Sequence, residues 1–343
     1  MVQTRRSKKA QRHVSAAYCW CAYITALAVI TAAALVLEPP PSLQERPLLR
    51  GLIYDVAATL IVYAFSLFAD NSSVYDPYWC VLPLWLLAYW RHEATDSARA
   101  LIVMNLVWAW AIRFFVGYPW EGWTRGLAHE DWRYADLRTK LGKGYWPFSL
   151  SSLHLTPTLL VFGALAPAGA IVVQEKSPPL NVGDLVACVV TLAFLVLEAV
   201  ADETLRRHRT RSKSTCVAGP WAWSRHPNYL GECGFWTGIY LFSRAAGISD
   251  ILYAIGPAAL WVFFRAASAP LMEERSRARR KDYDAVSPSA VLVPLPFLSR
   301  RARAEFGRPQ VVRRQGRPVG PDDDPGRRPS GRWFFERTWG SGS

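Results

Sequence analysis

The sequence predicts an all-α fold, a polytopic bundle of about eight transmembrane helices with an expected range of roughly six to nine. Two observations lead to this fold class. Apolar residues are gathered into long runs separated by short charged loops, and a run of about 20 apolar residues is what one bilayer crossing requires. The chain also contains 16 tryptophans and 14 tyrosines, which are enriched where membrane helices meet the bilayer surfaces.

The first predicted span covers residues 16–37, which contain no charged side chain. It follows a basic segment, residues 1–15, which has five lysines and arginines and no acid. The apolar core of a cleaved signal peptide is only about 7–15 residues long. We therefore expect an uncleaved anchor, with an organelle-targeting segment as the alternative.

Seven further spans are expected, separated by polar loops. Arg99 and Arg113 lie at the two ends of the fourth, where long side chains can reach the lipid headgroups. His154 in the fifth is an ionisable residue in a span and hence a functional candidate, although it could also reach the interface. Asp55 lies inside the second. These spans are residues 51–69, 78–89, 98–117, 150–173, 183–201, 228–242 and 251–267.

The charge distribution orients this bundle and divides the chain into three segments. Loops expected to be cytosolic, such as 118–149 and 202–227, hold many of the lysines and arginines, as the positive-inside rule requires. We expect a basic cytosolic N-terminus at 1–15, an integral membrane domain at 16–298 and a disordered tail rich in Arg, Pro and Gly at 299–343. Both termini are then cytosolic, and the endoplasmic reticulum or another endomembrane is the default location.

Composition and motifs also limit the partners. The net charge of +13 would suit nucleic acid, but much of it lies in the tails and beside apolar runs, so membrane lipid is the expected partner instead. The cysteines form no CxxC pair and the histidines no HExxH motif, so no disulfide framework or metal site is expected. There is no P-loop, and no GxGxxG follows a strand pattern, so a nucleotide would have to be bound in another way.

The main candidate site is residues 224–232, SRHPNYLGE, at the start of an apolar run. Proline favours the first turn of a helix, so a helix should begin near Pro227. A helix start presents free backbone N–H groups that suit a phosphate. Arg225 lies beside it, and Asn228 and Glu232, four residues apart, share a face. The alternative is a well-capped helix start with Arg225 facing lipid phosphate.

A second candidate is residues 129–134, HEDWRY. Reducing a double bond conjugated to a carbonyl requires hydride delivery to carbon and an acid that polarises the oxygen. Glu130, Asp131 and Tyr134 are the catalytic candidates for that role. The alternative is a juxtamembrane loop in which Glu130 or Asp131 forms an ion pair with Arg133 or Arg138. Nearby, in residues 75–79, YDPYW, the aspartate is interpreted as the N-terminal cap of the third span.

Together these motifs resemble the steroid 5-alpha-reductase-like membrane proteins, and most closely the DUF1295 branch. The resemblance covers residues 70–297 and includes Asp202 and Arg206 before SRHPNYLGE, and Glu273, Glu274, Arg275, Tyr283 and Pro294 after it. It implies an NADPH-dependent reductase acting on the carbon–carbon double bond of a lipophilic, steroid-like or fatty enone. It also implies an acid–tyrosine pair nearer the N-terminus, but the motifs do not identify that pair.

The resemblance also implies which residues bind NADPH. His226, Asn228 and Tyr229 carry over with the PNY motif, whereas Glu274 and Tyr283 lie where the spacing varies. Cations for the phosphates and hydrogen-bonding groups for the ribose and amide complete the set. The expected cofactor-binding residues are Arg206, Arg225, His226, Asn228, Tyr229, Glu232, Glu274, Arg277, Lys281 and Tyr283. Residues 287–289, SPS, depart from a more basic stretch expected after Lys281.

Two other functions remain open from the sequence. The isoprenylcysteine carboxyl methyltransferases look similar at RHPxYxG and at the later Glu, Tyr and Pro positions, but use S-adenosylmethionine. Asn228, YDPYW and HEDWRY favour the reductase. A non-catalytic lipid-binding or scaffold protein is the third possibility, and such a protein would bind neither cofactor.

The expected topology can be tested with N-glycosylation tags. A tag at residue 45, in a loop expected to be lumenal, should be modified, whereas a tag at residue 210 should not, because the modification is made on the non-cytosolic side. Gel mobility before and after deglycosylation measures this. The reverse pattern would invert the topology.

Overall fold

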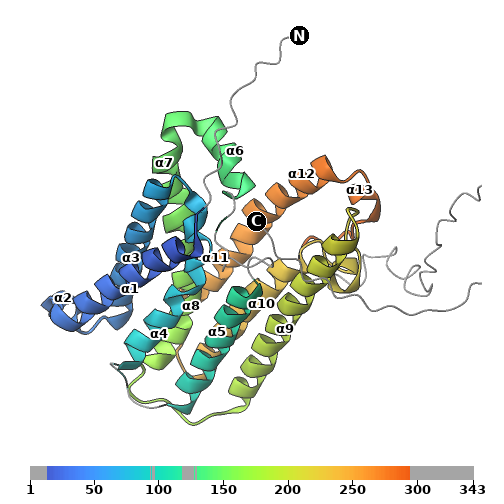
Figure 1. Ribbon diagram of the computed structural model, residues 1–343. Coiled ribbons are helices and arrows are strands. Elements are labelled where there is room, and N and C mark those ends of the chain that lie inside the picture. Colours follow the sequence, from blue (N-terminus) through green and yellow to red (C-terminus); the bar gives the residue numbers. More distant parts are fainter. Residues whose placement is uncertain (1–13, 93, 95–96, 118–126, 128–129, 294–343) are drawn as a thin grey trace, which may run out of the picture. The chain divides into compact units, whose positions relative to one another are not determined.

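The described residues are almost entirely helical. The structure is a computed structural model that describes residues 14–92, 94, 97–117, 127 and 130–293. Over these residues it is built from helices (Figure 1), apart from an isolated bridge between Val14 and Leu127. The predicted all-α fold is confirmed. The expected tail at 299–343, together with His129 and Pro294, lies outside the described residues.

The helices follow one another along the chain with short connections. The short turns α2 (Pro41–Gln44), η1 (Ser72–Tyr75) and α7 (Tyr145–Phe148) join longer elements, and α13 (Tyr283–Val286) is the last helical turn that the structure describes. The longer helices are α1 (Ala16–Val36), α3 (Pro47–Ala69), α4 (Leu82–His92), α5 (Ala98–Gly117), α6 (Trp132–Leu141), α8 (Thr156–Val172), α9 (Val182–Arg211), α10 (Pro227–Ala245), α11 (Ile255–Phe263) and α12 (Ala269–Arg279).

Six helical stretches among the described residues are long and apolar enough to cross a membrane. This confirms a polytopic membrane bundle, at the lower end of the expected range. They are Ala16–Val36, Pro47–Ala69, Ala98–Phe115, Trp132–Val172, Val182–Arg211 and Ile251–Arg279.

Two predicted spans form helices that do not meet these criteria. The helix α4 has 11 residues, fewer than the roughly 20 that a bilayer crossing needs. The helix α10 has 19 residues but carries polar ones such as Glu232 and Ser243, and both of these are buried. Because protein rather than lipid surrounds most of α10, its polar residues meet other side chains.

The helix α10 is packed directly on α9 through small residues. It lies behind α5 and α9 in Figure 1, and it also contacts α8 and α11. A Cβ atom added at Gly231 would come within 2.6 Å of the Glu198 Cβ, and one at Gly238 within 2.9 Å of the Thr191 backbone. The two helices can approach this closely only because these positions have no side chain.

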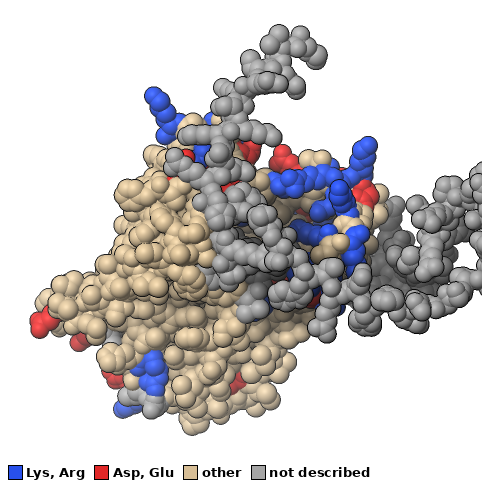
Figure 2. Space-filling view, in the orientation of Figure 1, with Lys and Arg blue, Asp and Glu red and all other residues tan. Residues whose placement is uncertain are grey.

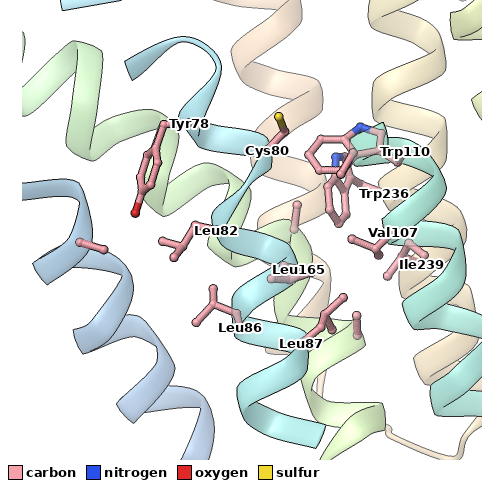
Figure 3. Close-up of a cluster of buried hydrophobic side chains, with 14 of the residues drawn as sticks. Tyr78, Cys80, Leu82, Leu86, Leu87, Val107, Trp110, Leu165, Trp236 and Ile239 are labelled. Atoms are coloured by element: carbon pink, nitrogen blue, oxygen red, sulfur yellow. The ribbon is translucent and has the colours of Figure 1, made fainter. Parts of the chain in front are cut away.

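The apolar core lies where α4 meets α5, α8 and α10. Figure 3 shows Leu86 and Leu87 of α4 near Leu165 of α8, with Trp110 and Trp236 beside them, and all five are buried. In a bilayer such packing stabilises through van der Waals contact rather than through exclusion of water. This core holds in place the helices that surround the candidate site.

Charged side chains lie mainly at one edge of the visible face. Figure 2 shows a broad surface without charged residues below a charged edge near α6, α12 and α13, and a smaller charged group lies near the opposite end. The prediction that Arg99 and Arg113 reach the headgroups is wrong. Arg99 is 1% exposed and binds Asp184 through two contacts of 2.6 and 2.8 Å. Arg113 is bound by acids of α9.

The α9–α10 contact predicts that alanine is tolerated at some glycines and not at others. Gly238→Ala should destabilise the protein by about 1–3 kcal/mol, because the new methyl group meets the Thr191 backbone and forces the helices apart. Gly144→Ala is the matched control, since nothing lies within 4 Å of its added Cβ. Thermal unfolding in detergent measures both. Equal unfolding temperatures would contradict the close packing.

Candidate functional site

One large cavity opens where α9, α10 and α12 meet the loop that precedes α10. Its volume is about 850 Å³, in the range of roughly 300–1,000 Å³ typical of small-molecule sites. Seven of the ten residues expected to bind a cofactor line it, which brings together segments far apart in the sequence. These seven are Arg206, Arg225, His226, Asn228, Tyr229, Glu232 and Tyr283.

The other three expected cofactor residues do not line this cavity. Glu274 and Lys281 are exposed. Arg277 is also exposed and pairs with Asp284 at 2.9 Å. Met272 and Ser276 of α12 line the cavity instead, together with Arg280, which directly follows the helix. Residues four apart share a helix face, and Glu274 is turned away from this one.

The entrance to α10 is held by the segment that follows α13. The helix begins at Pro227, as predicted. The backbone N–H groups of Arg225 and His226 donate to the carbonyls of Ala290 at 2.9 Å and Val291 at 3.2 Å. These bonds place both side chains at the cavity wall.

Glu273 of α12 binds the basic side chains at the start of α10. Its carboxylate accepts from the Arg225 Nη1 at 3.1 Å and from the Arg277 Nη2 at 3.2 Å. The His226 Nε2 lies 3.5 Å from the other oxygen, and its ring stacks on Tyr229 with an interplanar angle of 7°. Burial lowers the pKa of His226 and outweighs the raising effect of Glu273, so His226 is neutral near pH 7.

Three carboxyl groups and one guanidinium form the inner end of the cavity. Arg113 of α5 binds Glu198 at 2.5 Å and Asp202 at 2.9 Å. Glu232 of α10 accepts one bond from the indole N–H of Trp110, at 2.9 Å, and one from that of Trp236, at 2.7 Å. A buried charge requires such partners, because no water replaces them.

The outer end of the cavity is basic. Arg209, near the end of α9, and Arg280, at the end of α12, both line it and lie close enough for their charges to repel each other. Arg206 lines it as well but pairs with Glu203 at 2.6 Å. Two guanidinium groups directed at one space favour binding of a phosphate.

The HEDWRY candidates lie outside the cavity lining. Tyr134 donates to the Asp76 Oδ1 at 2.6 Å. Asp131 caps α6 and pairs with Arg133 at 2.8 Å. This is one of the ion pairs that the alternative interpretation predicted.

Glu130 forms the other ion pair that the alternative predicted, with Arg138 at 2.8 Å. It also accepts from the Ser72 N–H at 2.9 Å. The buried Glu130 therefore ties the loop that follows α3 to α6. Whether any of the three HEDWRY candidates acts in catalysis stays a prediction.

The interpretation of Asp76 as a cap of the third span is wrong. Asp76 follows η1, and its carboxylate faces Tyr134 rather than the first turn of α4. Burial raises the pKa of Asp76 to about 6, partly opposed by nearby Arg133. The YDPYW and HEDWRY segments are therefore joined through a buried hydrogen bond.

A second, much smaller cavity of about 10 Å³ lies next to Asp55 in α3. Tyr75 and Tyr78 line it with Thr158, and the Tyr75 hydroxyl lies 2.6 Å from that of Thr158. The Tyr78 hydroxyl is buried and has no hydrogen-bond partner among the described residues. Trp79 lines both this cavity and the large one.

His154 lies fully inside the bundle rather than at the interface. Its Nδ1 lies 2.9 Å from the Ser149 carbonyl, and its Nε2 lies 3.2 Å from the Ser66 hydroxyl. Among the described residues, no group of three or more His, Cys, Asp or Glu side chains could hold a metal ion.

Comparison with known proteins gives the family. A family described as "Protein of unknown function (DUF1295)" matches residues 62–288, about two thirds of the sequence. This chain belongs to the DUF1295 family. An uncharacterised protein of Schizosaccharomyces pombe (strain 972 / ATCC 24843) is 25% identical over 236 residues, which cover 61% of this chain and 68% of the relative. No solved structure matches this DUF1295 chain.

Sequence reasoning missed several residues at the cavity of this DUF1295 protein. Arg113 and Glu198 carried a signal, since ionisable residues in apolar runs are functional candidates. Arg209 and Arg280 carried none, because they lie in basic stretches where most side chains face solvent. Only the folded chain brings these two arginines to one cavity.

The raised pKa of Asp76 predicts a pH-dependent stability. The folded state binds this proton more tightly than an ordinary aspartate, with a pKa of about 6 against 3.8. Stability should therefore fall as pH rises from about 4 to about 6. Asp76→Asn should remove this fall and stabilise the protein at pH 7 by up to about 3 kcal/mol.

Thermal unfolding in detergent between pH 4 and pH 8 would measure this effect. Asp136→Asn is the control, because Asp136 is exposed and pairs with Lys140. A pH dependence that is the same in Asp76→Asn and in the wild type would contradict the assignment.

Proposed function

We propose that this DUF1295 protein is an NADPH-dependent membrane oxidoreductase that reduces a carbon–carbon double bond of a lipophilic, steroid-like or fatty enone. The family is steroid 5-alpha-reductase-like in general. The observation that carries the proposal is the large cavity itself, which joins an arginine-rich outer end to a buried, aromatic inner end. A dinucleotide has phosphates that suit the arginine-rich end and a flat ring that suits the aromatic end.

Buried polar atoms in the cavity support this fit. The Asn228 Oδ1 and the Arg113 Nε are buried and have no hydrogen-bond partner among the described residues. Leaving such groups unpaired costs about 1–3 kcal/mol each. A ligand with ribose hydroxyls and a carboxamide could pair with donors and acceptors of this kind.

The spacing of charges along α9 orients the proposed cofactor. Glu198 and Arg209 are 11 residues apart, which is about 16 Å along a helix. Arg209 and Arg280 would hold phosphate at the outer end. The uncharged or cationic nicotinamide ring would then lie at the inner end, beside Glu198 and Glu232.

The inner end also has apolar walls for the reaction. Trp79, Phe114 and Phe264 line the cavity there, and Trp79 packs edge-on against Phe114 with ring centroids 4.6 Å apart. When bound, NADPH would supply a hydride. Apolar walls exclude water, and the chain has to supply the acid.

Asp55 and Tyr78 are the residues that fit the acid–tyrosine pair implied by the 5-alpha-reductase resemblance. Both line the small cavity on the other side of Trp79. The unpartnered Tyr78 hydroxyl can donate a hydrogen bond to a substrate carbonyl, and Asp55 can orient it. HEDWRY would act indirectly, since Tyr134 holds Asp76 and thereby the segment that carries Tyr78.

The methyltransferase alternative is less well supported. S-adenosylmethionine has no phosphate, so it lacks the group that two guanidinium groups at the outer end would bind. A protein that binds this compound in preference to NADPH would overturn the proposal. Binding of neither would favour the non-catalytic alternative.

Calorimetric titration of the purified protein in detergent tests the proposal. NADPH should bind, and Arg280→Ala should weaken that binding about 10- to 100-fold, because a charged hydrogen bond to phosphate contributes about 1.5–3 kcal/mol. Asn228→Ala should also weaken binding, through loss of the amide at the cavity wall.

Arg244→Ala is the matched control. Arg244 lies in the last turn of α10, at the end opposite the cavity, and donates to the Ile248 carbonyl at 3.0 Å. Its loss should leave NADPH affinity unchanged. An equal effect of Arg280→Ala and Arg244→Ala would contradict phosphate binding at the outer end.

A further inference from the structure

The inner end of the cavity contains more negative than positive charge. Glu198, Asp202 and Glu232 lie around one guanidinium, that of Arg113. If all three carboxyl groups were ionised, this buried cluster would carry a net charge of about −2. Such a charge is costly in a site with little water, and it is reduced most simply when one carboxyl group keeps a proton.

The geometry indicates which carboxyl group keeps it. Both oxygens of Glu232 accept indole N–H groups, so neither is left without a donor. Both oxygens of Asp202 also accept bonds, from Arg113 at 2.9 Å and from Asn228 at 3.3 Å. Glu198 binds Arg113 through Oε1 only, and its Oε2 is buried without a donor among the described residues.

Glu198 and Glu232 face each other across the α9–α10 contact. Gly231, the residue before Glu232, lies directly against Glu198, and both glutamates line the same cavity. Two carboxylates cannot accept from one another, so a hydrogen bond between them requires a proton. Protonated Glu198 would donate from Oε2 to Glu232.

The other ionisable groups around this pair leave that balance unchanged. Arg113 comes from α5 and Asp202 from α9. Cys80, before α4, and Cys233 of α10 are buried thiols near Glu232, and a thiol in apolar surroundings stays neutral. Neither thiol adds a second positive charge, and the charge of Arg209 acts on Asp202.

We propose that Glu198 and Glu232 hold one proton between them, and that they release it when an oxidised, positively charged nicotinamide ring occupies the inner end of the cavity. The assignment rests on the proposed function, because it needs that cofactor. With the reduced, uncharged ring, the pair keeps its proton. With the cationic ring, the ionised pair provides the opposite charge.

This linkage matches the stoichiometry of the proposed reaction. Reduction of the double bond adds one hydride and one proton. The Glu198 O–H bond breaks, its electron pair stays on the carboxylate, and the proton passes to water and buffer, which in turn supply the one proton that the reduced product takes up. When the cofactor ring loses hydride it gains one positive charge. When the glutamate pair loses its proton it gains one negative charge, which balances the ring.

Calorimetry with two buffers of different ionisation enthalpy measures the protons released. NADP⁺ binding should release about one proton more than NADPH binding, and its affinity relative to NADPH should rise up to about tenfold per pH unit where the pair titrates. The 2′-phosphate occurs in both compounds, so its own titration cancels in this comparison. Equal proton release for the two compounds would overturn the proposal.

Infrared difference spectroscopy tests the shared proton, first in the protein alone and then with NADP⁺ added. The wild type should show the C=O stretch of a protonated carboxyl at neutral pH, shifted in D₂O and lost on addition of NADP⁺. Glu198→Gln should lack the band, and Asp136→Asn, in exposed α6, should keep it. If Glu198→Gln does not fold, Glu232→Gln should show a shifted or absent band.

The outcomes separate the two proposals. Cofactor binding with equal proton release, or a band unchanged by substitution of either glutamate, overturns the shared proton and leaves the reductase assignment standing. If neither nucleotide binds, the proposed function and the release both fail. The infrared band then still decides whether the pair holds a proton.

Discussion

The close contact of α9 with α10 is the constraint on which the site depends. Glycines at 231 and 238 remove the side chains that would separate the two helices. This allows a carboxyl group from each helix to meet at the inner end of one cavity. A bundle with ordinary side-chain spacing would hold Glu198 and Glu232 apart and would leave each to find its own partner.

Burial of charge inside the bundle is the second requirement. Arg113 serves two carboxylates of α9, and Glu232 is held by two indole N–H groups. Arg99 and Asp184 form a separate buried pair near the other end of α9. These residues thus have partners, as expected where lipid surrounds the protein and water cannot replace a lost bond.

The two cavities differ in chemistry and lie next to each other. Their positions set where the cofactor, the substrate and the acid would lie in the proposed reaction. The large one has arginines at one end and acids at the other. The small one has a carboxyl group, two tyrosines and a threonine. Trp79 belongs to both, so a substrate beside this side chain would lie between the proposed cofactor and the proposed acid.

Sequence reasoning identified much of the candidate site because its central motif is local. Pro227 begins a helix for reasons of backbone geometry, and helix periodicity then places Asn228 and Glu232 on one face. The same reasoning failed for Glu274 and Lys281, because neighbouring residues of a helix point in different directions and the sequence does not say which face of α12 is turned inward.

The sequence by itself determined the fold class, a helical membrane bundle, because long apolar runs have few other stable arrangements in lipid. It also determined the start of α10 and the basic character of the loop before it. Only the tertiary structure decided which charges meet: Arg209 with Arg280, Arg113 with the acids of α9, and Asp76 with Tyr134. Such pairs form between helices distant in the chain, and their partners depend on helix rotation and contact distance rather than on local pattern.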